Sequence, residues 1–288
     1  MYLGINSFTW ESPFNTQSAR LIAKAEQMGF DLFEVAFEDP KNTDLDEVKR
    51  AFQNSKVIPS VCGAFGPGRD ISSDDPAIQK QGMEYIATCI EAARAWGSKV
   101  VGGPMYACVG KARALPDNER RKERERSAAA LKELAQHAAR YGIMLAIEPL
   151  NRFENDMINT VEQAMAYLDL VDEPNVGLHI DLFHAHIEED DIGAALRLAG
   201  DRLLIVHASE NHRGTPGKGQ VRWNEVAAAL HDIGYQGSVT IESFTPNAES
   251  VRQAACIWRP LAESQDALAR EGLAFLRELF ASGATATA

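Results

Sequence analysis

Hydrophobic and polar positions along this chain follow one repeating order: a short apolar run, a turn, and a longer stretch with apolar residues at helical spacing. Eight such units can be counted. The predicted strands are Leu3 to Phe8, Leu32 to Phe37, Ile58 to Phe65, Val100 to Tyr106, Met144 to Glu148, Val176 to Asp181, Leu203 to His207 and Ser238 to Glu242. Strands that alternate with helices predict an α/β fold with a parallel sheet.

The helical stretches carry their own end signals. Predicted helices include Ala19 to Met28, Leu45 to Asn54, Pro76 to Trp96 and Asp117 to Tyr141, with glycine just after a helical pattern at Gly29, Gly97, Gly142 and Gly234. Glycine there is typical of a helix that ends on a left-handed residue. A last helical region at about 263–280 precedes a small, polar tail that we expect to be flexible.

Eight strand-helix units predict a (β/α)8 TIM barrel. The chain has 288 residues and no Pro/Gly/Ser linker divides it. Barrels of this kind commonly contain about 250 residues in one unit. We therefore expect a single domain over residues 1–288.

Four successive predicted strands end in a residue that can bind a metal: Glu148, Asp181, His207 and Glu242. Because the carboxyl ends of barrel strands meet at one mouth, where such barrels carry out their chemistry, these side chains should converge. A carboxylate there loses hydration and needs a compensating cation. Three carboxylates and one imidazole favour Mn²⁺, with Co²⁺ or Mg²⁺ as alternatives and Zn²⁺ behind them.

Composition narrows the possible partners. The chain has 41 acidic and 29 basic residues, a net charge of −12, so it repels phosphate backbones and we expect no nucleic-acid partner. The run from Glu119 to Arg126 mixes charge signs at helical spacing, which indicates a solvated helix face. The four cysteines form no CxxC pair and the first residues show no basic-then-apolar signal. We expect a cytoplasmic protein with reduced thiols and no membrane partner.

The residues around the four strand ends closely resemble the ketose 3-epimerases, which include the D-tagatose, D-allulose and L-ribulose 3-epimerases. The matching segments are Glu148-Pro-Leu-Asn-Arg-Phe-Glu154, Asp181-Leu-Phe-His184, His207-Ala-Ser-Glu-Asn-His-Arg213 and Glu242-Ser-Phe244. The resemblance implies a xylose isomerase-like barrel that binds Mn²⁺ or Co²⁺ and assembles as a homodimer or homotetramer. It also implies a small ketose as the substrate.

The same resemblance implies a role for each matching residue. Glu148, Asp181, His207 and Glu242 would bind the metal. Glu148 and Glu242 would also transfer the C3 proton from opposite faces of the sugar, through an enediolate. Substrate oxygens would be bound by Glu154, His184 and Arg213. Together these roles predict a metal-dependent epimerase that inverts C3 of a free ketose.

Other activities on the same barrel remain open. The alternatives are an aldose-ketose or hydroxypyruvate-type isomerase and an inosose dehydratase. An endonuclease IV-like repair enzyme would need further histidines and a basic DNA face, and the acidity of the chain argues against it. The preferred ketose is also open, because the segment from Pro104 to Gly110 lacks the tryptophan that several epimerases place beside the sugar.

Four further side chains near the predicted strand ends have alternative interpretations. Phe8 and Trp10 could stack on a sugar or pack in the barrel wall. Arg69 could meet a charged substrate, and we favour an ion pair with Asp70. His179, two positions before Asp181, could hydrogen-bond to a metal ligand.

Overall fold

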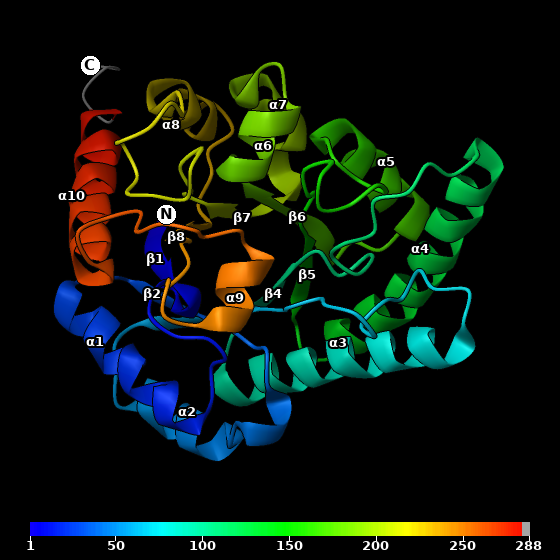
Figure 1. The fold of residues 1–288 in the computed structure, drawn as a ribbon, viewed down its shortest axis with the longest axis horizontal. Coiled ribbons are helices and arrows are strands. Elements are labelled where there is room, and N and C mark those ends of the chain that lie inside the picture. The colour runs from blue at the N-terminus through cyan, green and yellow to red at the C-terminus, as the bar shows by residue number, and fades with distance from the viewer. Residues whose placement is uncertain (284–288) are drawn as a thin grey trace.

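The computed structural model describes residues 1–283, and its eight parallel strands form a closed barrel. Each strand pairs with the next, and β8 pairs with β1. The strands are β1 Tyr2–Asn6, β2 Leu32–Ala36, β3 Ile58–Cys62, β4 Val100–Gly103, β5 Met144–Ile147, β6 Val176–Asp181, β7 Leu203–His207 and β8 Ser238–Ile241. Figure 1 shows the strands at the centre and the helices around them. The predicted (β/α)8 barrel is confirmed.

Five of the helices occupy stretches that were predicted from the sequence, with small shifts at their ends. The helices are α1 Arg20–Met28, α2 Leu45–Gln53, α3 Pro76–Trp96, α4 Asp117–Ala139, α5 Val161–Val171, α6 Leu182–Glu188, α7 Ile192–Ala199, α8 Trp223–Asp232, α9 Glu249–Ala254 and α10 Gln265–Gly283. Helix α10 is the predicted last helix, and it contacts α8, β1 and β8. The tail predicted to be flexible falls partly on residues 284–288, which lie outside the described residues.

The predicted helix-ending glycines adopt the backbone conformation that this role requires. Their φ angles are positive: 92° at Gly29, 87° at Gly97, 65° at Gly142 and 62° at Gly234. A residue with a Cβ pays a steric penalty in this region, whereas glycine does not. These glycines end helical segments or the turns that follow them.

Three predicted strands ran two or three residues too far toward the barrel mouth. The strand predicted to end at Phe8 stops at Asn6, the one predicted to end at Phe65 stops at Cys62, and the one predicted to end at Tyr106 stops at Gly103. Phe65 and Tyr106 are buried nevertheless. Hydrophobicity therefore continues past the strands because the loops at the mouth also pack into the core.

The strands are buried on both faces, as expected for parallel strands covered by helices. Every residue of β2 is buried. Phe33 of this strand packs among aromatic rings that include Trp10, at a ring-centroid distance of 6.5 Å. The Trp10 indole also donates a hydrogen bond to Asp266 Oδ1 at 2.9 Å and lies beneath the Lys24 ammonium. Trp10 therefore packs in the wall of the barrel.

A partly buried ion-pair network connects the loops that follow β3, β4 and β5. Lys111 Nζ lies 2.8 Å from Asp70 Oδ2, 2.6 Å from Ser72 Oγ and 2.5 Å from Glu123 Oε1. Arg113 extends the network from Glu123 to Asp156. Because these groups come from separate loops and from α4, the network holds one side of the barrel mouth together.

The structure overturns one prediction about charged residues and refines another. Arg69 does not pair with Asp70: its guanidinium donates to the carbonyl oxygens of Ala64 and Glu38 and stacks on the Tyr85 ring. The charged run in α4 presents a solvated face as predicted, with exposed pairs between Lys122 and Glu119 and between Arg121 and Glu125, but Glu123 within the run is buried. Sequence spacing suggested partners close by in the chain, whereas Asp70 and Glu123 both pair with Lys111, which lies in the loop after β4.

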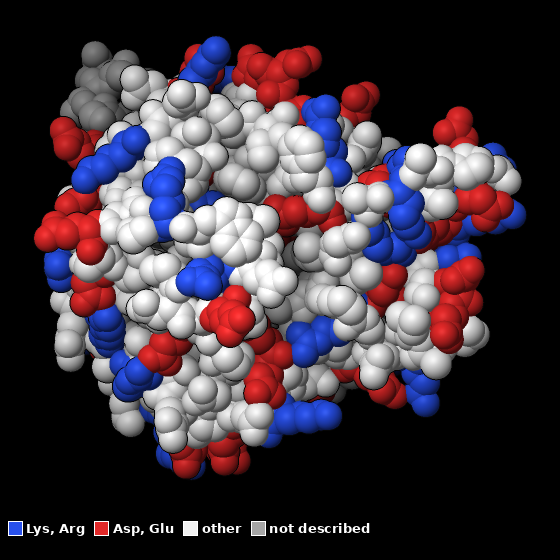
Figure 2. Space-filling model, in the orientation of Figure 1, with Lys and Arg blue, Asp and Glu red and all other residues white. Residues whose placement is uncertain are grey.

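The surface gives two further observations. Acidic and basic side chains are interspersed over the face of the molecule shown in Figure 2. Among residues 1–283, no helix has both the length and the apolar composition needed to cross a membrane.

Replacing Lys111 tests the ion-pair network. Lys111→Met should lower the free energy of unfolding by about 3 kcal/mol, because the buried Asp70 would lose its ammonium partner and the buried Glu123 would keep only Arg113. The matched control is Lys122→Met, which removes an exposed lysine paired with Glu119 on α4. Its effect should stay within about 0.5 kcal/mol. Urea unfolding of both variants measures the difference, and equal losses would contradict a special role for Lys111.

Candidate active site

The four predicted metal ligands converge at the carboxyl end of the barrel. Glu148 directly follows β5, Asp181 and His207 end β6 and β7, and Glu242 directly follows β8. All four side chains are buried, and one donor atom from each lies within 4.8 Å of the others. The parallel register of neighbouring strands produces this arrangement, since Asp181 pairs with His207 directly across β6 and β7.

This donor set fits a single divalent cation. Nδ1 of His207 lies 3.4 Å from Glu242 Oε2 and 3.9 Å from Asp181 Oδ2, and it is buried without a hydrogen-bond partner. Burial raises the pKa of Glu148 well above its ordinary value, and the charges of Glu242 and Asp181 raise it further. A cation among these groups would offset the carboxylate repulsion and satisfy the free imidazole nitrogen.

Arg213 supplies positive charge to the same site. Its Nη1 donates to Asp181 Oδ2, and to Glu242 Oε2 and Ser209 Oγ at 2.9 Å each. Burial opposes ionisation of Asp181, but Arg213 and the neighbouring histidines lower the pKa of that carboxyl below its usual range. The guanidinium also lies over the Phe183 ring, 4.2 Å from the centroid.

The backbone of Arg213 is held in an uncommon conformation. Its φ is 61°, in the left-handed region that few non-glycine residues adopt. Ser243 Oγ donates to the Arg213 carbonyl at 2.7 Å. The loop from β7 and the segment after β8 therefore fix Arg213 jointly. Such strain is common at sites where a side chain must be aimed in one direction.

His184 and Glu154 are both oriented by Asn151. The Asn151 backbone N–H donates to His184 Nδ1 at 3.1 Å, and the Asn151 side chain donates to Glu154 Oε1 at 2.9 Å. Burial lowers the pKa of His184 to about 3, so the ring is neutral near pH 7. Because Nδ1 accepts a hydrogen bond, the ring proton lies on Nε2, which is 3.3 Å from Arg213 Nη2. The His184 Nε2–H and an Arg213 N–H therefore lie side by side, where one acceptor atom could bind both.

Glu34 contacts one of the four candidate metal ligands and was not identified from the sequence. Its Oε1 lies 2.6 Å from His207 Nε2, and its carboxylate accepts from Asn6 Nδ2 at 2.8 Å and Ser60 Oγ at 3.0 Å. Burial raises the pKa of Glu34, but His207, Asn6 and Ser60 lower it below the ordinary value. An ionised Glu34 places the imidazole proton on Nε2 and leaves the Nδ1 lone pair for a cation. The available signal was an acidic residue inside an otherwise apolar strand.

A cavity of about 450 Å³ opens beside these residues. Glu148, Glu154, His184, Arg213 and Glu242 contribute its polar lining. Much of the remaining wall is apolar, including Phe8, Phe65 and Phe244, so Phe8 is placed where it can contact a bound molecule. Glu38 also lines the cavity, and burial raises its pKa to about 7.

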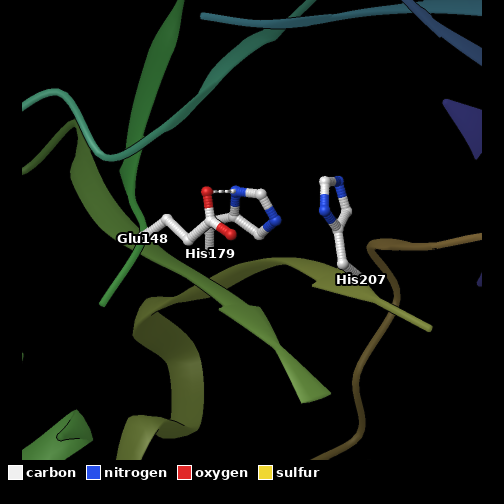
Figure 3. Close-up of side chains that lie close together, drawn as sticks. All are labelled: Glu148, His179 and His207. Atoms are coloured by element: carbon white, nitrogen blue, oxygen red, sulfur yellow. Dashed lines mark ion pairs between the residues drawn. The ribbon is translucent and has the colours of Figure 1, made fainter. Parts of the chain in front are cut away.

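The predicted hydrogen bond from His179 to a metal ligand is not present. Its Nδ1 lies 3.7 Å from Glu148 Oε2, and neither ring nitrogen has a hydrogen-bond partner. Figure 3 shows His179 beside Glu148, with His207 approaching from the neighbouring strand. The inward position of His179 was predicted correctly from the alternation of residues along β6, but the hydrogen bond was not.

Comparisons with known proteins agree with this geometry. The family model described as "Xylose isomerase-like TIM barrel" matches residues 22–279. An L-ribulose 3-epimerase from Methylomonas sp. (strain DH-1) is 34% identical over 280 residues, covering 96% of this chain and 97% of that protein. A solved L-ribulose 3-epimerase structure is 32% identical with a TM-score of 0.93, and covers 98% of this chain and 95% of that one. The D-allulose 3-epimerase from Methylomonas sp., solved with D-allulose, is 33% identical with a TM-score of 0.90 and 96% coverage of both chains.

Glu34→Gln should weaken Mn²⁺ binding by about 10- to 100-fold, the usual effect of losing a partner that orients a metal-binding histidine. The amide cannot provide the negative charge that holds the proton on His207 Nε2. Glu38→Gln is the matched control, because Glu38 follows the same strand but bonds to Ser12 instead. Isothermal titration of the metal-free proteins with Mn²⁺ measures the effect. Unchanged affinity in Glu34→Gln would show that Glu34 does not support the site.

Proposed function

We propose that this chain, which belongs to the xylose isomerase-like TIM barrel family and to the ketose 3-epimerases within it, inverts C3 of a free ketose. Ketose 3-epimerases are isomerases. The proposed substrate is a ketose of the allulose or ribulose type. The observation that carries the proposal is the placement of Glu148 and Glu242. They follow strands β5 and β8, on different sides of the barrel mouth, and their donor atoms lie within 4.8 Å of each other. Both line the cavity.

Epimerisation requires a proton to leave one face of C3 and another to arrive on the opposite face. One glutamate removes the proton next to the C2 carbonyl, which gives an enediolate, and the other glutamate returns a proton to the far face. One carboxyl must therefore begin protonated and the other ionised, and turnover exchanges the two states. The raised pKa of Glu148, caused by burial and by the nearby charge of Glu242, supports a pair that shares one proton.

Glu148, Asp181, His207 and Glu242 would hold the divalent ion, which we propose is Mn²⁺, with Co²⁺ or Mg²⁺ as alternatives. The chemistry supplied by such an ion is electrostatic: positive charge beside the carbonyl stabilises the negative charge of the enediolate. Arg213 adds a fixed positive charge from this chain, since Asp181, Glu242 and Glu154 raise its pKa despite its burial.

The substrate oxygens would be bound by His184, Arg213 and Glu154. The His184 and Arg213 nitrogens that lie 3.3 Å apart are both donors, so one sugar oxygen can accept from both. Glu154 offers a carboxyl group at the cavity wall for a hydroxyl. Arg69 also lines the cavity, but two carbonyl oxygens already accept from its guanidinium. This arrangement favours an uncharged sugar over a sugar phosphate.

The first test is a panel of free ketoses. The Mn²⁺-loaded protein should convert D-fructose, D-tagatose, D-allulose or L-ribulose to the corresponding C3 epimer, which chromatography identifies. Treatment with a chelator should abolish turnover, and Mn²⁺ or Co²⁺ should restore it. Mn²⁺ should also raise the melting temperature, because an ion that binds only the folded state stabilises it by mass action. Full turnover in metal-free protein would contradict the proposal, as would an aldose as the product.

The second test follows the hydrogen at C3. In D₂O the product should gain solvent deuterium at C3, whereas an aldose-ketose isomerase would label C1 or C2. Glu148→Gln and Glu242→Gln should each reduce epimerisation by about 10²- to 10⁴-fold, because each loses one of the two proton-transfer groups. Glu225→Gln, exposed on α8, is the control and should retain the wild-type rate. An unlabelled C3, or near wild-type turnover in either of the first two variants, would rule out the two-base mechanism.

A further inference from the structure

His179 is a fully buried side chain with no assigned task in the proposed reaction. It lies on β6, two residues before Asp181, and therefore points to the same side of the strand one layer deeper in the barrel. Its exposed fraction is 0%, and both ring nitrogens lack a hydrogen-bond partner. A neutral imidazole has one N–H donor and one lone pair, and leaving both unpaired in the interior is costly.

The surroundings of His179 point to a ligand for that lone pair. The donor atoms of His179, Glu148 and His207 lie within 4.8 Å of one another, and all three side chains are buried. The two imidazole rings have centroids 3.9 Å apart at an interplanar angle of 75°. Figure 3 shows Glu148 beside His179, with His207 on the other side of the His179 ring. His207 Nδ1 is also without a hydrogen-bond partner, so two imidazoles here have an unused nitrogen.

Space beside the ring depends on Gly102 of β4. A Cβ at this position would lie 3.2 Å from His179 Nδ1 and 2.8 Å from the Ile205 side chain. The absence of a side chain at Gly102 therefore leaves room along the Nδ1 edge of the imidazole, on the side that faces Glu148.

This three-donor set leaves the ion pairs of the main site intact. It uses neither Asp181 nor Glu242, so Arg213 keeps its bonds to both of these carboxylates. Glu148, Asp181, His207 and Glu242 form the four-donor set of the main site. A cation bound there would use Asp181 and Glu242, the two carboxylates to which Arg213 donates. The two sets also differ in chemistry: two imidazoles and one carboxylate favour Zn²⁺ or Cu²⁺, whereas three carboxylates and one imidazole favour Mn²⁺ or Mg²⁺.

We propose that His179, His207 and Glu148 form a second metal position inside the barrel, which takes a nitrogen-preferring ion such as Zn²⁺ or Cu²⁺ and excludes an ion from the four-donor position. Exclusion follows because Glu148 and His207 belong to both sets. An ion at the deeper position also occupies Glu148, so it inhibits the enzyme. The site itself does not depend on the proposed epimerase function; only the inhibition does.

Electron paramagnetic resonance of the wild-type protein with one equivalent of Cu²⁺ tests the site directly. Nitrogen hyperfine splitting should show two imidazole ligands, because His179 and His207 both bind. Splitting from one nitrogen would place the ion in the four-donor set and overturn the proposal. This measurement needs no catalytic activity, so it separates failure of the site from failure of the proposed reaction.

Two variants should separate the positions. His179→Leu should remove one nitrogen from the Cu²⁺ spectrum and weaken Zn²⁺ binding by about 100-fold or more, since even an indirect partner of a ligand changes affinity by about 10- to 100-fold. Its Mn²⁺ affinity should stay close to that of the wild type. Asp181→Asn should do the reverse, weakening Mn²⁺ while keeping two nitrogens on Cu²⁺. Circular dichroism checks that both variants fold.

Competition between ions completes the test. Zn²⁺ should displace Mn²⁺ from the wild-type protein, as followed by the Mn²⁺ resonance signal of the released ion, and should inhibit ketose turnover in parallel. In His179→Leu the Zn²⁺ concentration that displaces Mn²⁺ should rise by about the loss in Zn²⁺ affinity. Simultaneous binding of both ions to the wild type, or equal displacement in the wild type and His179→Leu, would overturn mutual exclusion at this site.

Discussion

Negative charge concentrated on buried side chains at the barrel mouth is the constraint on which the site depends. Glu34, Glu148, Asp181 and Glu242 are all nearly inaccessible to solvent. Carboxylates in such an environment repel one another and lose hydration, so each needs a hydrogen bond, a positive partner or a proton. The structure supplies each of these. Three polar groups contact Glu34, Arg213 contacts two of the carboxylates, and a raised pKa favours a proton on Glu148.

The supporting structure is built largely from loops that are fixed at more than one point. Arg213 is held in a left-handed conformation by Ser243, and His184 is held by the backbone of Asn151. Lys111 ties together the loops after β3 and β4 and helix α4. These attachments matter because proton transfer needs side chains placed to within a fraction of an ångström, and loops alone do not provide that precision.

Which of two donor sets binds an ion would decide whether the proposed reaction can proceed. One set is Glu148, Asp181, His207 and Glu242, and the other is Glu148, His179 and His207. Glu148 and His207 are common to both, so an ion that recruits His179 would occupy one of the two glutamates proposed to transfer the proton as well as one of the proposed metal ligands. His179 lies one layer below the carboxylates at the mouth of the barrel. The proposed deeper position and the four-donor position would therefore offer an ion different ligands while sharing Glu148 and His207. Geometry and donor type, more than affinity alone, determine which ion such a site selects.

The sequence by itself determined the architecture and the positions of the main side chains. Apolar runs and helical stretches are local patterns, and their regular spacing was enough to predict eight strands and a barrel with Glu148, Asp181, His207 and Glu242 at its mouth. Register follows from that regularity, because parallel strands of one barrel end at the same level. The flanking segments, from Glu148 to Glu154 above all, also predicted the ketose 3-epimerase family correctly.

Only the tertiary structure decided the partners of these side chains. Glu34 and His207 lie 173 residues apart in the chain, and Asp70 meets Lys111 rather than its sequence neighbour Arg69. His179 was predicted to point inward, but whether a hydrogen-bond partner would be present depended on the residues that β4, β5 and β7 place around it. The physical reason is that hydrophobic periodicity fixes the direction in which a side chain points, whereas a hydrogen bond or ion pair depends on atoms that arrive from distant parts of the chain.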